Sequence, residues 1–91
     1  GEYKFFTLRP APYPKSDIPA HIHPTVKEPD KNAYWIDDYV FDDDPNVNDK
    51  YRSREEKRCG SGIITLIPED NILYYAKRDI VLGRNVTNYP D

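Results

Sequence analysis

The sequence has little of three things that would indicate a function directly: cysteine, excess positive charge and long apolar runs. Its single cysteine, Cys59, cannot form an internal disulfide and has no cysteine or histidine at zinc-ligand spacing. Lysine and arginine total 13 against 16 aspartates and glutamates, a net charge of −3, so we expect no nucleic-acid partner. The longest apolar runs, such as residues 63–67, are far shorter than the roughly 20 residues of a membrane-spanning helix, so we expect no membrane partner. Nothing in the sequence indicates a cellular compartment.

The size and composition of the chain limit it to one small domain. It has 91 residues and a mass of 10.7 kDa, and only 37% of its residues are hydrophobic. Eight tyrosines, three phenylalanines and one tryptophan supply much of the apolar area, because a buried aromatic ring covers a large surface. We therefore expect a single domain with a thin core that is rich in aromatic side chains.

The distribution of β-branched, aromatic and turn-forming residues favours strands over helices. Strands are predicted near residues 2–8, 20–27, 34–41, 62–67 and 72–83. The proline-rich residues 10–19 exclude a helix and predict an ordered, extended loop, while the polar residues around 49–57 allow only a solvated helical turn. These features predict an all-β fold, an antiparallel β-sandwich, with residues 10–19 as a loop at the active site.

The residues with the clearest chemical potential are Tyr13, His21 and His23. His21 and His23 are the two histidines of the chain, and residues i and i+2 of a strand point to the same face, so the two imidazoles can bind one metal ion side by side. The alternative is that both are polar residues on the solvent-exposed face of an edge strand and bind no metal. Tyr13 lies between Pro12 and Pro14, which restrict the backbone and hold its phenol in place, and a phenolate is a hard anionic donor suited to Fe(III).

Three segments carry a family resemblance: residues 1–10 (GEYKFFTLRP), 12–14 (PYP) and 19–23 (PAHIH). Their order and spacing resemble the signature region of the intradiol ring-cleavage dioxygenases, which are non-haem Fe(III) enzymes. Residues 39–45 (YVFDDDP) resemble the strand and acidic turn that follow in that family, and residues 78–83 (RDIVLG) resemble its closing strand. The resemblance covers more than half of the chain, and the segments with tyrosine and the two histidines are its specific part.

The resemblance implies a β-sandwich that holds one ferric ion between two tyrosinates and two histidines. Such a centre binds a catechol-type aromatic ring, and O₂ is inserted between its two hydroxylated carbons. Transferred to this chain, the metal ligands are Tyr13, His21 and His23. Tyr13 is also the candidate catalytic residue, because in the family one tyrosinate can leave the metal and accept the substrate proton.

The chain departs from the family pattern at three positions. Ile18 stands where an arginine usually stabilises negative charge on the substrate, and Lys15 replaces a common aromatic residue. Asp38 stands where a glutamine often lies near the bound oxygen. Arg9 or Lys15 could supply the missing positive charge, and which aromatic compound is the substrate stays open.

The second tyrosinate has no counterpart in the twelve residues before Tyr13, because Tyr3 is too close. We therefore expect residues 1–91 to form the C-terminal portion of one catalytic domain, incomplete at the N-terminus, in which iron binds weakly without the rest. Apolar faces on Phe5, Phe6 and residues 63–67 would then pair with a second copy, as a homo-oligomer, or with the missing N-terminal segment.

Several other functions fit parts of the sequence. His21, His23 and Glu28 mimic the two-histidine, one-carboxylate iron site of a cupin. A β-sandwich that kept the scaffold but lost catalysis could be a binding module, with residues 34–44 as its contact surface. The five aspartates of residues 37–44 could bind Ca²⁺, although a solvated strand end is the simpler interpretation. Cys59 beside Lys57 and Arg58 is a remote candidate nucleophile.

Overall fold

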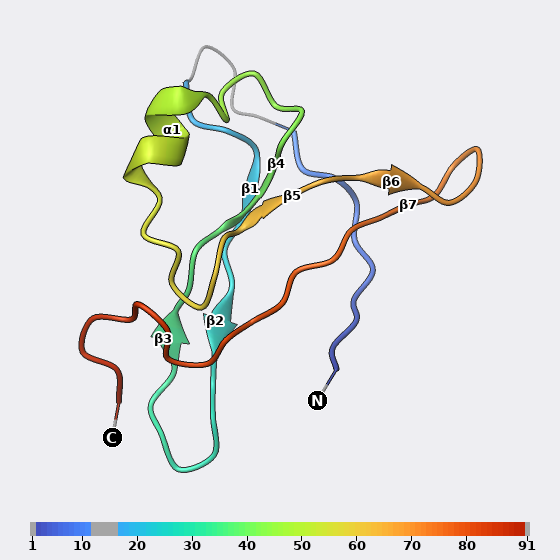
Figure 1. Ribbon diagram of the computed structural model, residues 1–91. Coiled ribbons are helices and arrows are strands. Elements are labelled where there is room, and N and C mark those ends of the chain that lie inside the picture. The colour runs from blue at the N-terminus through green and yellow to red at the C-terminus, as the bar shows by residue number, and fades with distance from the viewer. Residues whose placement is uncertain (1, 12–16, 91) are drawn as a thin grey trace.

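Short strands and long connecting loops make up most of the structure. The computed structural model describes residues 2–11 and 17–90 (Figure 1). Its elements in chain order are β1 (His21–Ile22), β2 (Thr25–Val26), β3 (Tyr34–Trp35), β4 (Tyr39–Phe41), α1 (Asp49–Arg54), β5 (Ile63–Ile64), β6 (Ile67–Pro68) and β7 (Tyr74–Tyr75). The predicted all-β class is confirmed, since the described residues are mostly strands and loops with one six-residue helix.

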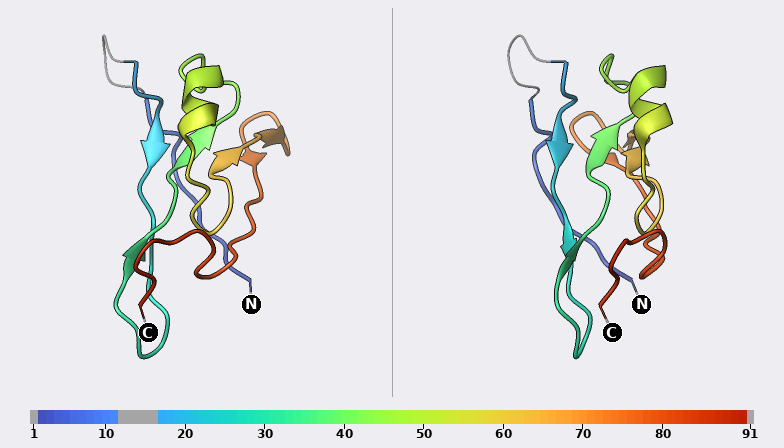
Figure 2. Two further views of the ribbon diagram at one scale, coloured as in Figure 1. Left: turned by 60° about the vertical axis from the view of Figure 1, so that its left-hand side comes forward. Right: turned by 90° about the vertical axis from the view of Figure 1, so that its left-hand side faces the viewer.

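Within the described ranges, the strands pair in three small sheets. The largest has the order β1-β4-β5, while β2 pairs with β3 and β6 with β7. β1 and β4 are antiparallel, but β4 and β5 are parallel, with Val40 opposite Ile63. The prediction of a purely antiparallel arrangement is wrong at β5, because the chain crosses over through α1 and returns in the direction of β4 (Figures 1 and 2).

The predicted strands 20–27 and 34–41 form one antiparallel ribbon that is interrupted in its middle. Two residues, His23 and Pro24, lie between β1 and β2, whereas three residues, 36–38, lie between β3 and β4. The extra residue makes a β-bulge, and Pro24 has no N–H group to donate to the ladder. The two predicted strands are therefore wrong as continuous elements. The bulge lies next to the two histidines, since His21 is in β1 and His23 directly follows β1.

The other two long strands of the prediction are also too long. Residues 62–67 divide into β5 and the start of β6, and residues 72–83 contain only β7. Residues 76–83 form no strand in the structure, and a single backbone hydrogen bond of 3.1 Å, from Val81 N to Cys59 O, joins them to the neighbouring segment. Gly83, with a φ of +77°, turns the chain away there.

Arg78 explains why this segment packs closely without forming a strand. Its buried side chain donates from Nη1 to the carbonyl oxygen of Asp37 at 2.7 Å and from Nη2 to that of Gly60 at 3.3 Å. The guanidinium also lies over the ring of Tyr39, 4.7 Å from its centroid. Side-chain donors thus take the place of the backbone bonds that a strand would make.

The N-terminal segment is extended, but the predicted strand at residues 2–8 is wrong. Its contacts come from side chains: Tyr3 donates to the carbonyl oxygen of Arg78 at 2.6 Å, and the rings of Phe5 and Tyr39 meet edge to face at 5.7 Å. Phe6 is 83% exposed. Without a paired backbone on either side, an extended segment is not a strand.

The core is small, as expected from the composition. Tyr34, Ile36 and Cys59 form its centre, with Val26, Ile80, Val86 and Tyr89 packed around them. Cys59 is fully buried, so its thiol serves the core and cannot act as a nucleophile in the folded chain.

The predicted helical turn at residues 49–57 is confirmed as α1, which ends three residues early. Asn48 caps it by accepting a hydrogen bond from Tyr51 N at 3.0 Å. Glu55 leaves the helix with an extended backbone and accepts from Gly62 N at 3.1 Å. Nowhere in residues 2–11 and 17–90 is a helix long and apolar enough to cross a membrane.

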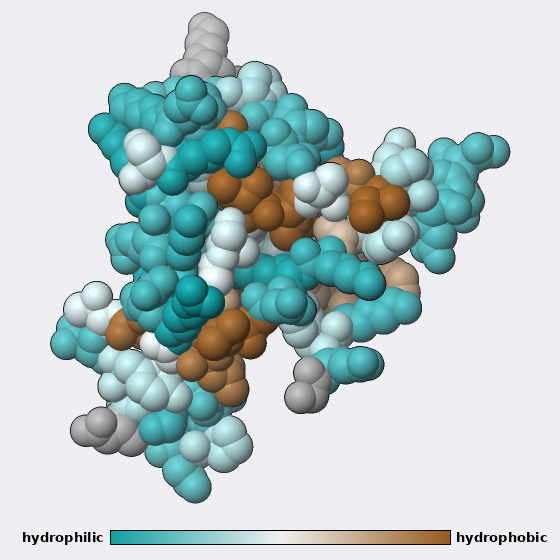
Figure 3. Space-filling view, viewed as in Figure 1, coloured by the Kyte–Doolittle hydropathy of each residue, from teal (hydrophilic) through white to brown (hydrophobic). Residues whose placement is uncertain are grey.

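The surface of the molecule is large and partly apolar. Its accessible area is 7200 Å², against roughly 5500 Å² for a compact monomer of this mass. Figure 3 shows several separate apolar patches on one face, and Ile72 and Leu73 in the β6–β7 hairpin are 85% and 49% exposed. The expected pairing with a second copy or an N-terminal segment stays a prediction.

Candidate metal centre

His21 and His23 lie side by side where the ribbon breaks. His21 is in β1 and His23 follows it, and their ring centroids are 4.4 Å apart at an angle of 73°. His21 is half-buried, and the side chain of His23 is 59% exposed. The sequence-based prediction that the two imidazoles emerge together is confirmed.

The backbone before His21 is held by the acidic turn after β4. Asp44, which is buried, accepts a hydrogen bond from Ala20 N at 3.0 Å through Oδ2 and one from Asn46 N at 2.9 Å through Oδ1. The carbonyl oxygen of Pro19 in turn accepts a bond of 2.7 Å from Nδ1 of His21. The proline, the buried alanine and the aspartate therefore fix where the first imidazole lies.

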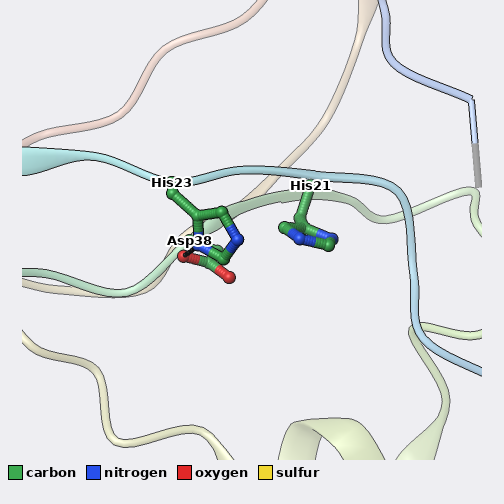
Figure 4. Close-up of side chains that lie close together, drawn as sticks. All are labelled: His21, His23 and Asp38. Carbon is green, nitrogen blue, oxygen red and sulfur yellow. Dashed lines mark hydrogen bonds and ion pairs between the residues drawn. The ribbon is translucent and has the colours of Figure 1, made fainter.

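Asp38 completes a cluster of three potential ligands. Continuing the β1–β4 register by one residue places Asp38 directly opposite His23, and its Oδ1 lies 2.8 Å from Nδ1 of His23. Ligand atoms of His21, His23 and Asp38 all lie within 4.8 Å of one another (Figure 4). The resemblance placed Asp38 near the bound oxygen, and the structure brings it to the histidines themselves.

The two hydrogen bonds decide which imidazole nitrogens can bind a metal. Carbonyl and carboxylate oxygens only accept, so Nδ1 of each histidine must carry the proton. In a neutral imidazole the lone pair is then on Nε2, and histidine ligands in proteins usually donate their other N–H to such an acceptor. The donor set of the described residues therefore fits the two-histidine half of the ferric site that the resemblance implies.

Gly62 brings a second segment of backbone against Asp38. A Cβ atom at position 62 would overlap the carbonyl oxygen of Asp38 and lie 2.8 Å from its carbonyl carbon. Gly62 O also accepts from Val40 N at 2.9 Å, which joins this approach to the β4–β5 pair. Only glycine permits this close approach, so Gly62 helps to set the position of Asp38.

A cavity of about 310 Å³ opens beside the cluster. It is lined by His23, Trp35, Ile36, Asp38 and Arg58. The indole of Trp35 is an exposed aromatic wall and meets the ring of His23 edge to face at 6.1 Å. This volume lies at the small end of the range for ligand sites, where a single substituted ring fits.

Arg58 is the positive group of this cavity. Its Nε donates to the buried carboxylate of Asp37 at 2.9 Å, and this hydrogen bond raises the pKa of the guanidinium above its ordinary value. Sequence reasoning missed Arg58, because twenty residues separate it from Asp38; the adjacent acidic residues were the one available signal. Of the two candidates named from sequence, Arg9 instead pairs with Asp43 at 2.6 and 3.1 Å, and Lys15 lies outside the described residues.

Of the three remaining predicted site residues, the structure describes two. Tyr13, the candidate catalytic ligand, lies outside the described residues, while Ile18 is 51% exposed and lines a second cavity of about 410 Å³. Glu28, the third ligand of the cupin-like alternative, is not in the cluster. Its carboxylate accepts from the hydroxyls of Tyr34 and Tyr89 at 2.7 and 2.6 Å, and these bonds lower the pKa of Glu28.

The five aspartates of residues 37–44 do not converge on a calcium ion. Asp37 binds Arg58, Asp38 binds His23, Asp43 binds Arg9 and Asp44 caps the backbone at Ala20, with Asp42 bonded to Thr65. The solvated strand end expected from sequence is therefore wrong for Asp37 and Asp44, which are buried. Seven residues of 34–44 are buried, so this segment offers little of the contact surface of a binding module.

Comparisons with protein-family models, with curated proteins and with solved structures find no match for this chain.

Proposed function

We propose that this chain carries the histidine half of a non-haem Fe(III) centre of the intradiol dioxygenase type, which cleaves a catechol-type aromatic ring with O₂. One observation supports this above the others. His21 and His23 both donate from Nδ1, which puts the lone pair of each neutral ring on Nε2, within the PAHIH segment on which the family resemblance rests. The β-sandwich of that family belongs to the same proposal.

Tyr13 supplies the anionic ligand in this proposal. Ala20 donates to Asp44 and His21 donates to the carbonyl oxygen of Pro19, and in the sequence Tyr13 precedes this segment between two prolines. A phenolate oxygen stabilises Fe(III) over Fe(II), and the neutral histidines complete a mixed donor shell. Tyr13, His21 and His23 would hold the ferric ion, which would supply the activation of a bound catechol dianion toward O₂.

The chain's own residues bind and orient the ring. The cavity beside His23 receives it, with Trp35 as an apolar wall. Arg58 compensates the negative charge of the deprotonated substrate and so takes the part that Ile18 cannot. Tyr13 accepts a substrate proton when the ring binds.

The test is iron loading followed by visible spectroscopy. Because this chain alone is expected to bind iron weakly, Fe(III) is added in excess; we expect a red-brown tyrosinate band, which Tyr13→Phe shifts or abolishes, and we expect His21→Ala to release the iron. Tyr74→Phe is the matched control, since Tyr74 is exposed in β7 and should leave the band unchanged. Ring opening is measured by O₂ uptake with catechol and by mass spectrometry of the product. A colourless protein that takes up only zinc would contradict the proposal.

A further inference from the structure

The contact between Asp38 and His23 allows two different metal centres. In one, Asp38 binds the metal together with the two histidines, as in the two-histidine, one-carboxylate oxygenases. In the other, Asp38 binds only Nδ1 of His23, and the metal binds on the opposite side of that ring. The two arrangements share the same three residues but differ in the net charge of the groups bound to the metal and in the number of protein ligands.

We propose that Asp38 is a positioning residue of the metal centre: its carboxylate holds His23 with Nδ1 protonated and Nε2 available to the metal, and does not itself bind the metal. This inference rests on the proposed metal-binding function. It concerns a residue to which the resemblance assigned a different place, near the bound oxygen.

The geometry of imidazole favours the second arrangement. Oδ1 of Asp38 lies 2.8 Å from Nδ1 of His23. A metal about 2.1 Å from Nε2 of the same ring would lie roughly 7 Å from that oxygen, far beyond a carboxylate–metal bond. Figure 4 shows the Nε2 edge of His23 turned toward His21, where a metal shared by the two histidines would lie.

His21 supports the same choice of nitrogen. Its Nδ1 lies 2.7 Å from the carbonyl oxygen of Pro19, so it too binds a metal through Nε2. The two rings therefore have equivalent supports, a peptide carbonyl for His21 and a carboxylate for His23. The stronger acceptor serves the more exposed ring, since the side chain of His23 is 59% exposed and His21 is half-buried.

The register of the ribbon makes Asp38 suited to this role. Asp38 stands opposite His23 at the end of the β1–β4 pair, and Gly62 backs its peptide on the other side. The backbone at Asp38 is thus fixed from two directions. A carboxylate at this place also makes the histidine a more basic ligand than the neutral amide of a glutamine would.

The first measurement uses the metal-free protein and long-range ¹H–¹⁵N correlation spectra of the two histidines, at a pH where both are neutral. We expect His23 in the Nδ1–H form, and a shift toward the Nε2–H form in Asp38→Ala. His21 is the internal control and should keep its form, because Pro19 still accepts from it. An unchanged His23 spectrum in Asp38→Ala would overturn the proposal.

The second measurement is the affinity for Co²⁺, followed by its visible absorption. We expect Asp38→Ala to weaken binding about 10–100-fold, the usual effect of losing a partner of a histidine ligand. Asp38→Asn should weaken it less than about tenfold, because the amide oxygen still accepts from Nδ1. Asp43→Asn removes the same charge from the exposed pair with Arg9 and should change nothing.

Loss of Co²⁺ binding in Asp38→Asn as complete as in His21→Ala would show that Asp38 is a ligand and refute the inference. If the wild-type chain binds neither Co²⁺ nor Fe(III), the proposed function fails. The spectrum of the metal-free protein then still decides whether Asp38 sets the form of His23.

Discussion

Replacing Gly62 with alanine should damage both the stability of this chain and its proposed metal centre. The added methyl group would overlap the carbonyl oxygen of Asp38 and lie 2.8 Å from its carbonyl carbon. Even a close C–H···O contact needs roughly 3.3 Å, so the Asp38 peptide and residue 62 must separate by more than about 1 Å. Both neighbours are backbone atoms, so no side-chain rotation can relieve the contact.

The expected cost follows from what this movement breaks. Inserting a methyl group into a packed site costs about 1–3 kcal/mol, and the bond of 2.9 Å between Val40 N and Gly62 O lies next to the displaced peptide. For a chain of this size, a loss of about 2 kcal/mol lowers the melting temperature by roughly 8–16 °C. The Asp38–His23 bond should be lost as well, because a shift of about 1 Å takes it beyond hydrogen-bonding distance.

Thermal unfolding by circular dichroism and Co²⁺ titration measure the two effects separately. Gly83→Ala is the control. Residue 83 has a left-handed backbone, and its added methyl group would lie 3.0 Å from the ring of Tyr89 but would contact none of the three site residues. It should lower the melting temperature without changing metal affinity beyond the loss of folded protein. A Gly62→Ala chain that melts within a degree or two of wild type and binds Co²⁺ equally well would refute this reasoning.

Three further predictions follow from the fold. Cys59 should react with a thiol reagent only after unfolding, since it is fully buried; rapid labelling of the native chain would contradict this core. The pKa of Glu28 is lowered by the hydroxyls of Tyr89 and Tyr34, so its contribution to stability is present above the ordinary glutamate pKa and is lost as the pH falls through the lower value in the folded chain. Glu28→Gln should therefore flatten the acid side of the stability curve, measured by urea unfolding at several pH values. The exposed Phe6 and Leu8 favour self-association, which sedimentation would detect as a mass above 10.7 kDa.

Local patterns in the sequence predicted the features that depend on neighbouring residues. The all-β class, the short helix at 49–54 and the shared side of His21 and His23 all follow from spacing over a few positions. The strand lengths did not follow, because pairing depends on partners elsewhere in the chain. Residues 2–8 have the composition of a strand but pair with no strand in the part of the chain that the structure describes.

The residues of the candidate site were likewise predictable only where they are neighbours in the sequence. The histidine pair was predictable, whereas the approach of Asp38 depends on the register between β1 and β4, and that of Arg58 on a loop that returns twenty residues later. From the sequence, Arg9 or Lys15 could supply the missing positive charge, and Arg9 is as basic as Arg58. Both arginines pair with an aspartate, Arg9 with Asp43 and Arg58 with Asp37, and a single-chain pattern cannot show that Arg58 is the one that lines the cavity.

Asp37 and Asp38 are adjacent but have different partners, because successive residues of an extended chain point to opposite sides. Asp37 turns inward, where its carboxylate accepts from Lys57 N at 2.7 Å, from Arg58 N at 3.0 Å and from Arg58 Nε at 2.9 Å. Asp38 consequently turns to His23. A slip of one residue in this register would exchange them, leaving the buried anchor without its partners and a different carboxylate at the histidines. The partly buried ion pair of Asp37 with Arg58, outside the donor cluster, thus determines which of the two acids meets the two histidines.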